Sequence, residues 1–183
     1  MRRGRVAPSV GFPPTGDGAA RALVLGSLPC VKSLQMQQYY AQPHNAFWRI
    51  MGELFGAGPE LEYAARLARL RAHGIAVWDV LAAGEREGSL DSAIVPSSIV
   101  VNDFNAFFER HRRVRLICFN GNTAAGLFRR KVLPGLAAEW AAIERHPLPS
   151  TSPAYAGMRF PQKLAAWAAV LGSLPPVAHR ARP

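Results

Sequence analysis

Residues that bind metals or form reactive amines are scarce in this sequence. It has two cysteines, Cys30 and Cys118, far apart and without metal-ligand spacing, and its five histidines are scattered singly. We therefore expect neither zinc nor an iron–sulfur cluster, and no other cofactor. The only lysines are Lys32, Lys131 and Lys163, and none lies in a motif typical of a Schiff-base nucleophile.

Other absences narrow the class of protein further. No apolar run reaches the ~18 residues that a membrane span needs, so we expect no contact with a membrane. No GxGxxG or GxxxxGK[ST] pattern is present, which disfavours an enzyme of small nucleotides. Residues 1–20 are basic but lack the apolar core of a signal peptide, which favours a cytoplasmic setting.

Length and charge suggest one domain with a polyanionic partner. The chain has 183 residues, of which 49% are hydrophobic, enough for a single core. We expect a disordered basic arm over 1–20, one catalytic domain over 21–174 and a disordered tail over 175–183. Twenty-two basic residues against 12 acidic ones give a net charge of +10, which favours nucleic acid, although a GC-rich genome also produces an arginine excess.

Hydrophobic patterning predicts alternating strands and helices. Apolar runs at 22–25, 75–81, 115–119 and 143–148 are separated by segments with helical periodicity, which include 60–73, 123–133 and a final helix from Phe160. This alternation predicts an α/β protein, a three-layer α/β/α sandwich with a four-stranded, mainly parallel sheet.

A polar turn follows each of the four expected strands. The sequences of these turns are GSLPC, WDVL, FNGN and LPSTSP. Carboxyl ends of parallel strands meet at one edge of the sheet, so the four turns should converge there and form a ligand site.

Three of these motifs also resemble those of a known family. GSLPC (26–30), QQYYAQPHNAFW (37–48) and LPSTSPAYA (148–156) are similar to stretches of the uracil-DNA glycosylase superfamily and, within it, of the hypoxanthine-DNA glycosylase family. The resemblance implies a monofunctional glycosylase of base-excision repair that removes hypoxanthine from double- or single-stranded DNA and acts as a monomer. A uracil or G-mismatch uracil/thymine glycosylase is the nearest alternative.

The resemblance also implies how the attacking water is positioned. Most of the superfamily has Asp or Asn at the position of Leu28, and leucine cannot hold a water, so Asn45 is the implied substitute. Asn45 could instead be a helix N-cap. Asp79 is the rival catalytic residue, as an anion that stabilises an oxocarbenium-like cation, or else a structural acceptor. Cys30 replaces the usual glycine and would be strained if that position required a positive φ.

The remaining candidates would bind the flipped base or the DNA. For the base they are Gly26, Ser27 and Leu28 of the turn, the aromatic residues Tyr40, Phe47 and Phe119, and Asn120, whose amide can donate and accept. For DNA they are Ser150, Thr151, Ser152 and Pro153. Ordinary alternatives remain open: the aromatics could be core, Asn120 a turn residue and 149–153 a surface turn. A non-catalytic nucleic-acid-binding α/β protein would keep the charge but not need this convergence.

Overall fold

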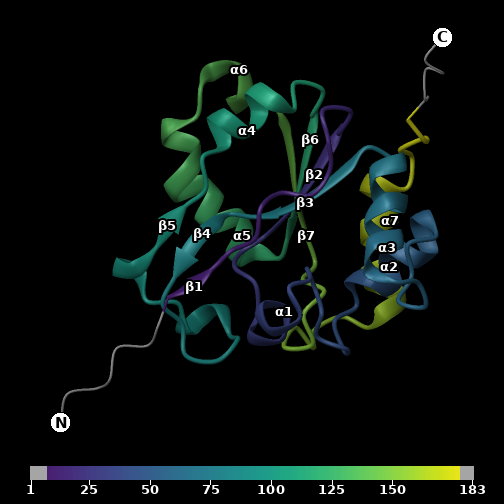
Figure 1. Cartoon of the computed structure of the whole chain (residues 1–183), viewed down its shortest axis with the longest axis horizontal. Helices are drawn as coiled ribbons and strands as arrows, with labels where there is room; N and C mark the ends of the chain where they lie inside the picture. The colour runs from purple at the N-terminus through teal and green to yellow at the C-terminus, as the bar shows by residue number, and fades with distance from the viewer. Residues whose placement is uncertain (1–7, 178–183) are drawn as a thin grey trace.

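A four-stranded parallel sheet forms the centre of the protein. A computed structural model describes residues 8–177 and shows the strand order β3-β2-β6-β7, with every neighbouring pair parallel (Figure 1). The strands are β2 (Ala22–Gly26), β3 (Ile75–Asp79), β6 (Leu116–Asn120) and β7 (Glu144–Leu148). The sequence-based prediction of four parallel strands is confirmed, with boundaries shifted by at most two residues.

The burial of each strand explains its composition. Every residue of β2 and β3 is buried, as expected of strands covered by helices on both faces, which are apolar throughout. Strand β7 lies at the edge of the sheet and contains Pro147, which a central strand would not tolerate because proline lacks a backbone N–H.

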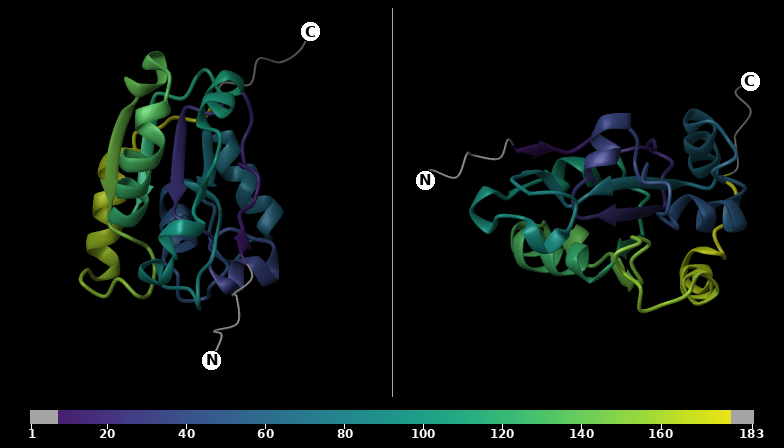
Figure 2. Two further views of the ribbon diagram at one scale, coloured as in Figure 1. Left: turned by 90° about the vertical axis from the view of Figure 1, so that its left-hand side faces the viewer. Right: turned by 90° about the horizontal axis from the view of Figure 1, so that it is seen from below.

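Helices cover both faces of the sheet, which completes the predicted sandwich (Figures 1 and 2). On one side lie α2 (Phe47–Phe55), α3 (Tyr63–Ala72) and α7 (Phe160–Leu171); on the other lie α4 (Phe104–Arg110), α5 (Asn122–Leu127) and α6 (Ala138–Ala141). The helix expected at 123–133 begins as α5 and continues as a π-helical segment, Phe128–Val132. The short α1 (Val31–Met36) follows β2.

A second, antiparallel sheet was not predicted. It consists of β1 (Ser9–Val10), β4 (Leu81–Gly84) and β5 (Val100–Val101), in the order β1-β4-β5. The single strand expected at 75–81 therefore divides after Asp79. At the division Val80 N donates to Gly26 O and Leu81 N to Ser27 O, so the chain leaves the parallel sheet while it remains bonded to the turn after β2.

The expected disordered ends need correction where the structure describes them. Residues 8–20 are ordered by contacts with the domain: β1 pairs with β4, and Thr15 exchanges hydrogen bonds with Val77. In the expected tail, Val177 N donates to Ala72 O at 2.7 Å. The rest of the predicted arm and tail, 1–7 and 178–183, lies outside the described residues.

Candidate active site

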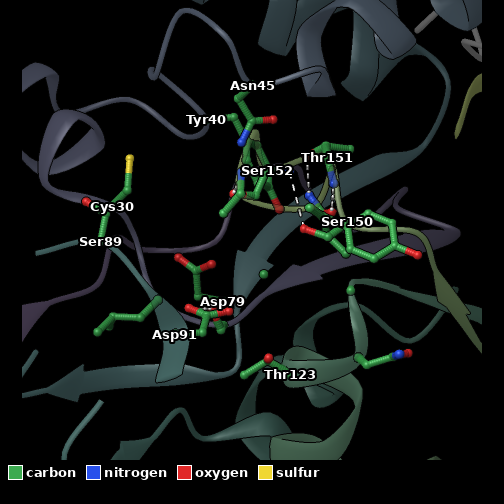
Figure 3. A pocket seen from close by; sticks show the side chains of 18 of the residues that line it. Cys30, Tyr40, Asn45, Asp79, Ser89, Asp91, Thr123, Ser150, Thr151 and Ser152 are labelled. Atoms are coloured by element: carbon green, nitrogen blue, oxygen red, sulfur yellow. Dashed lines mark hydrogen bonds between the residues drawn. The ribbon is translucent and has the colours of Figure 1, made fainter. Parts of the chain in front are cut away.

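The four strand ends meet at a cavity of about 490 Å³ (Figure 3). The register places Gly26 beside Asp79, and Asn120 beside Leu148, so these four residues form one edge of the sheet. The prediction that the polar turns converge is confirmed. The predicted residues that line this cavity are Gly26, Ser27, Leu28, Tyr40, Asn45, Asp79, Asn120, Ser150, Thr151 and Ser152.

Gly26 is required by close packing at the base of the cavity. A β-carbon at this position would collide with Asp79 Oδ1 and would lie 3.1 Å from the Tyr40 hydroxyl oxygen. The absence of a side chain at the end of β2 therefore makes room for an acid and a phenol at the same place.

Arg86 holds the turn that follows Gly26. Its guanidinium Nη1 donates to Leu28 O at 3.5 Å, its Nη2 donates to Pro29 O, and its Nη1 lies 3.4 Å from Asp91 Oδ1. The Ser27 hydroxyl donates to the same Asp91 oxygen at 2.7 Å. Arg86 is buried, so its hydrogen bonds hold the turn against the interior of the protein.

Cys30 occupies the turn without strain. Its backbone is extended, with φ −71° and ψ 164°, so the position does not demand glycine in this chain. The Cys30 sulfur caps α1 by accepting a hydrogen bond from Ser33 N at 3.4 Å.

Tyr40 is the aromatic residue that faces the cavity. It adopts a left-handed backbone with φ 55°, and its ring stacks on Phe47 with centroids 4.0 Å apart. Its hydroxyl is buried and has no hydrogen-bond partner among the described residues. Burial, and then the nearby Asp79, raise the pKa of this phenol well above its ordinary value. Tyr40 therefore presents a neutral O–H group.

Two of the predicted base-binding aromatics do not line the cavity. Phe47 is 0% exposed and lies behind Tyr40, where it packs on Trp48 at 5.0 Å and Trp167 at 6.1 Å between ring centroids. Phe119 is 3% exposed and packs on Phe128 at 5.2 Å. Consecutive residues of a strand face opposite sides of a sheet, so Phe119 in β6 can point into the core. Phe47 is the first residue of α2 and lies on the buried face of that helix. Both assignments are corrected to core residues.

Asn45 lies at the rim of the cavity, immediately before α2. Its Oδ1 accepts a hydrogen bond from Phe47 N at 2.9 Å, so it does satisfy one N–H group at the start of the helix. The next residue, Ala46, donates from its backbone N to Thr151 O at 2.9 Å. The start of α2 is thereby bonded to the loop after β7. Asn45 combines a capping contact with a position on the cavity wall.

Asn120 and Thr151 form a reciprocal pair across the cavity. Asn120 Nδ2 donates to Thr151 Oγ1 at 2.8 Å, and Thr151 N donates to Asn120 Oδ1 at 2.8 Å. These bonds use one N–H of the Asn120 amide and one of the two lone pairs of its oxygen, so a second N–H, close to the Tyr40 hydroxyl, remains for a base. Thr151 is 1% exposed and joins β6 to the loop, and its role in binding DNA stays a prediction.

The other residues of the 149–153 loop are better placed for a polyanion. Ser150 Oγ accepts from Ser152 N, and Ser152 Oγ accepts from Ala154 N, which leaves both hydroxyl hydrogens free to donate. Pro153 is exposed and lies outside the cavity lining. Lys163 supports the loop from beneath, because its buried Nζ donates to Tyr155 O at 2.9 Å and to Ser152 O at 3.5 Å.

Several cavity residues were not predicted from the sequence. Asp91 reaches the cavity from the connection between β4 and β5, and exposed Tyr155 and Met158 flank it on the loop. Asp91 begins a 3₁₀ turn, Asp91–Ala93. Arg86 carried no sequence signal, since nothing in GEREG distinguishes a buried arginine from an exposed one.

Metal and membrane features are not found in the described part of the chain. Within 8–177, no three His, Cys, Asp or Glu residues cluster in a way that could hold a metal ion. Across the same residues, no helix combines the length and the apolar character needed to cross a bilayer.

Comparison with known proteins identifies the family. The profile of the uracil DNA glycosylase superfamily matches residues 13–171. A hypoxanthine DNA glycosylase of Methanosarcina acetivorans is 39% identical over 156 residues, which cover 74% of this chain and 98% of the relative. A protein of the same name from Methanosarcina barkeri is 39% identical over 112 residues, 61% of this chain and 70% of the relative.

A solved structure shows the same fold. The solution NMR structure of a candidate uracil DNA glycosylase from Methanosarcina acetivorans superposes with a TM-score of 0.76 at 36% sequence identity, and covers 92% of this chain and 99% of that one. The match of fold, the sequence profile over most of the domain and the relatives that align along it lead to one conclusion: this chain belongs to the uracil DNA glycosylase superfamily.

Proposed function

We propose that this protein is a DNA glycosylase that hydrolyses the N-glycosidic bond of deoxyinosine and releases hypoxanthine. The observation that carries the proposal is the polar cavity at the carboxyl ends of all four parallel strands, in a chain 39% identical to proteins named hypoxanthine DNA glycosylase. At about 490 Å³ the cavity has the size of a small-molecule site, large enough for one extruded base.

The cavity offers groups for both halves of the reaction. Hydrolysis at C1′ needs an oriented water. Asn45 would orient it, because the side chain of Leu28, on the turn after β2, has no polar atom. The departing base needs hydrogen-bond donors. The free N–H of Asn120 and the unpaired Tyr40 hydroxyl can supply them.

The loop after β7 is the proposed contact with DNA. The Ser150 and Ser152 hydroxyls can donate to phosphates, and exposed Tyr155 and Met158 stand beside the cavity where they could fill the space of an extruded nucleotide. The net charge of +10 would attract the backbone of either single- or double-stranded DNA.

The chemistry supports a monofunctional enzyme. None of the residues that line the cavity is a lysine, and Lys163 directs its Nζ to two loop carbonyls. Without an amine at the site no Schiff base forms with the sugar, so the abasic strand would be left uncut. The monomeric state and the cytoplasmic location remain predictions from the sequence.

The experiment is incubation with labelled duplexes that contain deoxyinosine, deoxyuridine, deoxyxanthosine or a G·T mismatch, followed by alkali cleavage. We expect strand breaks only after alkali, and most rapidly with deoxyinosine. Faster cleavage of deoxyuridine or G·T substrates would support the uracil or mismatch alternative instead. Binding without any release of base would support the alternative of a non-catalytic nucleic-acid-binding protein.

A further inference from the structure

Asp79 is a buried acid without a hydrogen-bond donor. The residue is 4% exposed at the end of β3, and its Oδ2 is buried without a hydrogen-bond partner among residues 8–177. An ionised carboxylate in such surroundings is costly, because no donor compensates the charge on the buried oxygen. The geometry therefore favours the neutral carboxylic acid.

The charges around Asp79 lead to the same conclusion. From the β4–β5 connection it faces Arg86 and Asp91, from the segment after α1 it faces the phenols Tyr39 and Tyr40, and from α3 it faces the phenol of Tyr63. The single cation, Arg86, lies 3.4 Å from Asp91, which also accepts a hydrogen bond from the Ser27 hydroxyl. Burial raises the pKa of Asp91 as well, while the Ser27 hydroxyl and Arg86 act in the opposite direction. One cation therefore faces two acids, and the cluster would carry a net negative charge if both were ionised.

The pKa of Asp79 is raised, in agreement with these surroundings. Burial, and then the charge of Asp91, raise the pKa of the Asp79 carboxyl to about 8, while Arg86 acts in the opposite direction. This state differs from the anion expected from the sequence, which would have stabilised the sugar cation. The side chain nevertheless lines the cavity, in the space that Gly26 leaves open, and Figure 3 labels it beside Asp91.

We propose that Asp79 is the general acid of the reaction and donates its proton to the departing base. This role rests on the proposed function. As the C1′–N9 bond breaks, its electron pair moves to the base and the Asp79 proton neutralises an acceptor atom of that base. The water oriented by Asn45 forms the new C1′–O bond and loses a proton to solvent, from which Asp79 is reprotonated. The products are free hypoxanthine and an abasic sugar.

The pH dependence of single-turnover release tests this role. The wild-type rate should fall above about pH 8, where Asp79 loses its proton. Asp79→Ala should lower the rate at pH 7 by about 10²–10⁴-fold, the usual range for a general acid. Asp79→Asn keeps a donor but no transferable proton, so it should retain part of the rate without the alkaline decline. A wild-type rate that rises through pH 8, or a decline that persists in Asp79→Asn, would overturn the proposal.

A second measurement uses the protein without DNA. Because the folded state holds the Asp79 proton after the unfolded chain has released it, wild-type stability should fall as pH rises from about 4 to about 8. Asp79→Asn lacks this loss, so its stability relative to wild type should increase over the same window. Carbon-13 NMR of the Asp79 carboxyl should show the titration directly.

The two measurements separate the two proposals. An Asp79 that titrates near pH 8 in a protein that releases no base would refute the proposed function, and with it the catalytic role. An Asp79 that ionises near pH 4 in a protein that does release hypoxanthine would refute the general acid alone.

Discussion

Substitution of Asn45 by alanine tests the central assignment of the site. The side chain has two possible roles, because its Oδ1 accepts from Phe47 N at 2.9 Å while the residue also lines the cavity. A capping residue stabilises the fold, whereas a residue that orients the water lowers the barrier of the chemical step. The two contributions appear in different measurements.

The expected magnitudes are far enough apart to be resolved. Loss of the capping contact should cost about 1 kcal/mol of unfolding free energy, which lowers the melting temperature of a domain of this size by about 2–4 °C. Loss of one oriented polar group should lower the single-turnover rate by about 10²–10³-fold, or about 3–4 kcal/mol in the barrier. Affinity for the inosine duplex should change little, since the contact matters mainly in the transition state.

Asp103→Ala is a matched control for the capping effect. Asp103 is the N-cap of α4 and also satisfies a backbone N–H at a helix start, since its Oδ1 accepts from Ala106 N at 2.9 Å, but it lies outside the cavity lining. The control should lose similar stability and keep the full rate per folded molecule. If Asn45→Ala behaved like Asp103→Ala, with a lower melting temperature and an unchanged rate, Asn45 would be only a cap.

Three further outcomes are expected. DNA affinity should weaken with salt at a log–log slope of about −4 to −5, for ~4–6 neutralised phosphates, and a slope near zero in a titration by fluorescence anisotropy would argue against DNA as the substrate. Ser150→Ala combined with Ser152→Ala should lower the release of hypoxanthine from duplex more than from single strands, which need little extrusion, so equal losses would contradict the role of the loop. Gly26→Ala should abolish most activity while circular dichroism remains native, because the added methyl group collides with Asp79 and crowds Tyr40; a fully active variant would show that this contact is unimportant.

The parallel sheet could be predicted because its strands are buried on both faces. The runs ALVL and IAVW are apolar throughout, and they end at Gly26 and Asp79. The antiparallel sheet could not be predicted in the same way. Its strands are two to four residues long, and Ser9–Val10 is partly exposed, so neither length nor alternation distinguishes it from a loop. Its pairing depends on contacts far apart in the sequence.

The cavity residues also differ in how well they could be predicted from the sequence. Those in recognisable turns, such as Gly26, Asn45 and Asn120, were identified from the sequence and do line the cavity. The direction of the Phe119 side chain could not be predicted, because neighbouring residues of a strand face opposite sides of the sheet. Phe47 begins α2, and the sequence did not show that its side chain lies on the buried face of that helix.

The charge state of Asp79 is the property that required the complete structure. An isolated acid at a strand end gives no indication of whether it is ionised, since that depends on which cations and donors reach it. Here the one cation, Arg86, comes from a connection that the sequence did not place near the site, and it is bonded to Asp91 and to the carbonyls of the turn. A site rich in acids thereby becomes able to donate a proton near neutral pH. The same arrangement gives the interior arginine a role: it pairs with Asp91, which also accepts from Ser27, and Asp79 has no such partner for its buried Oδ2.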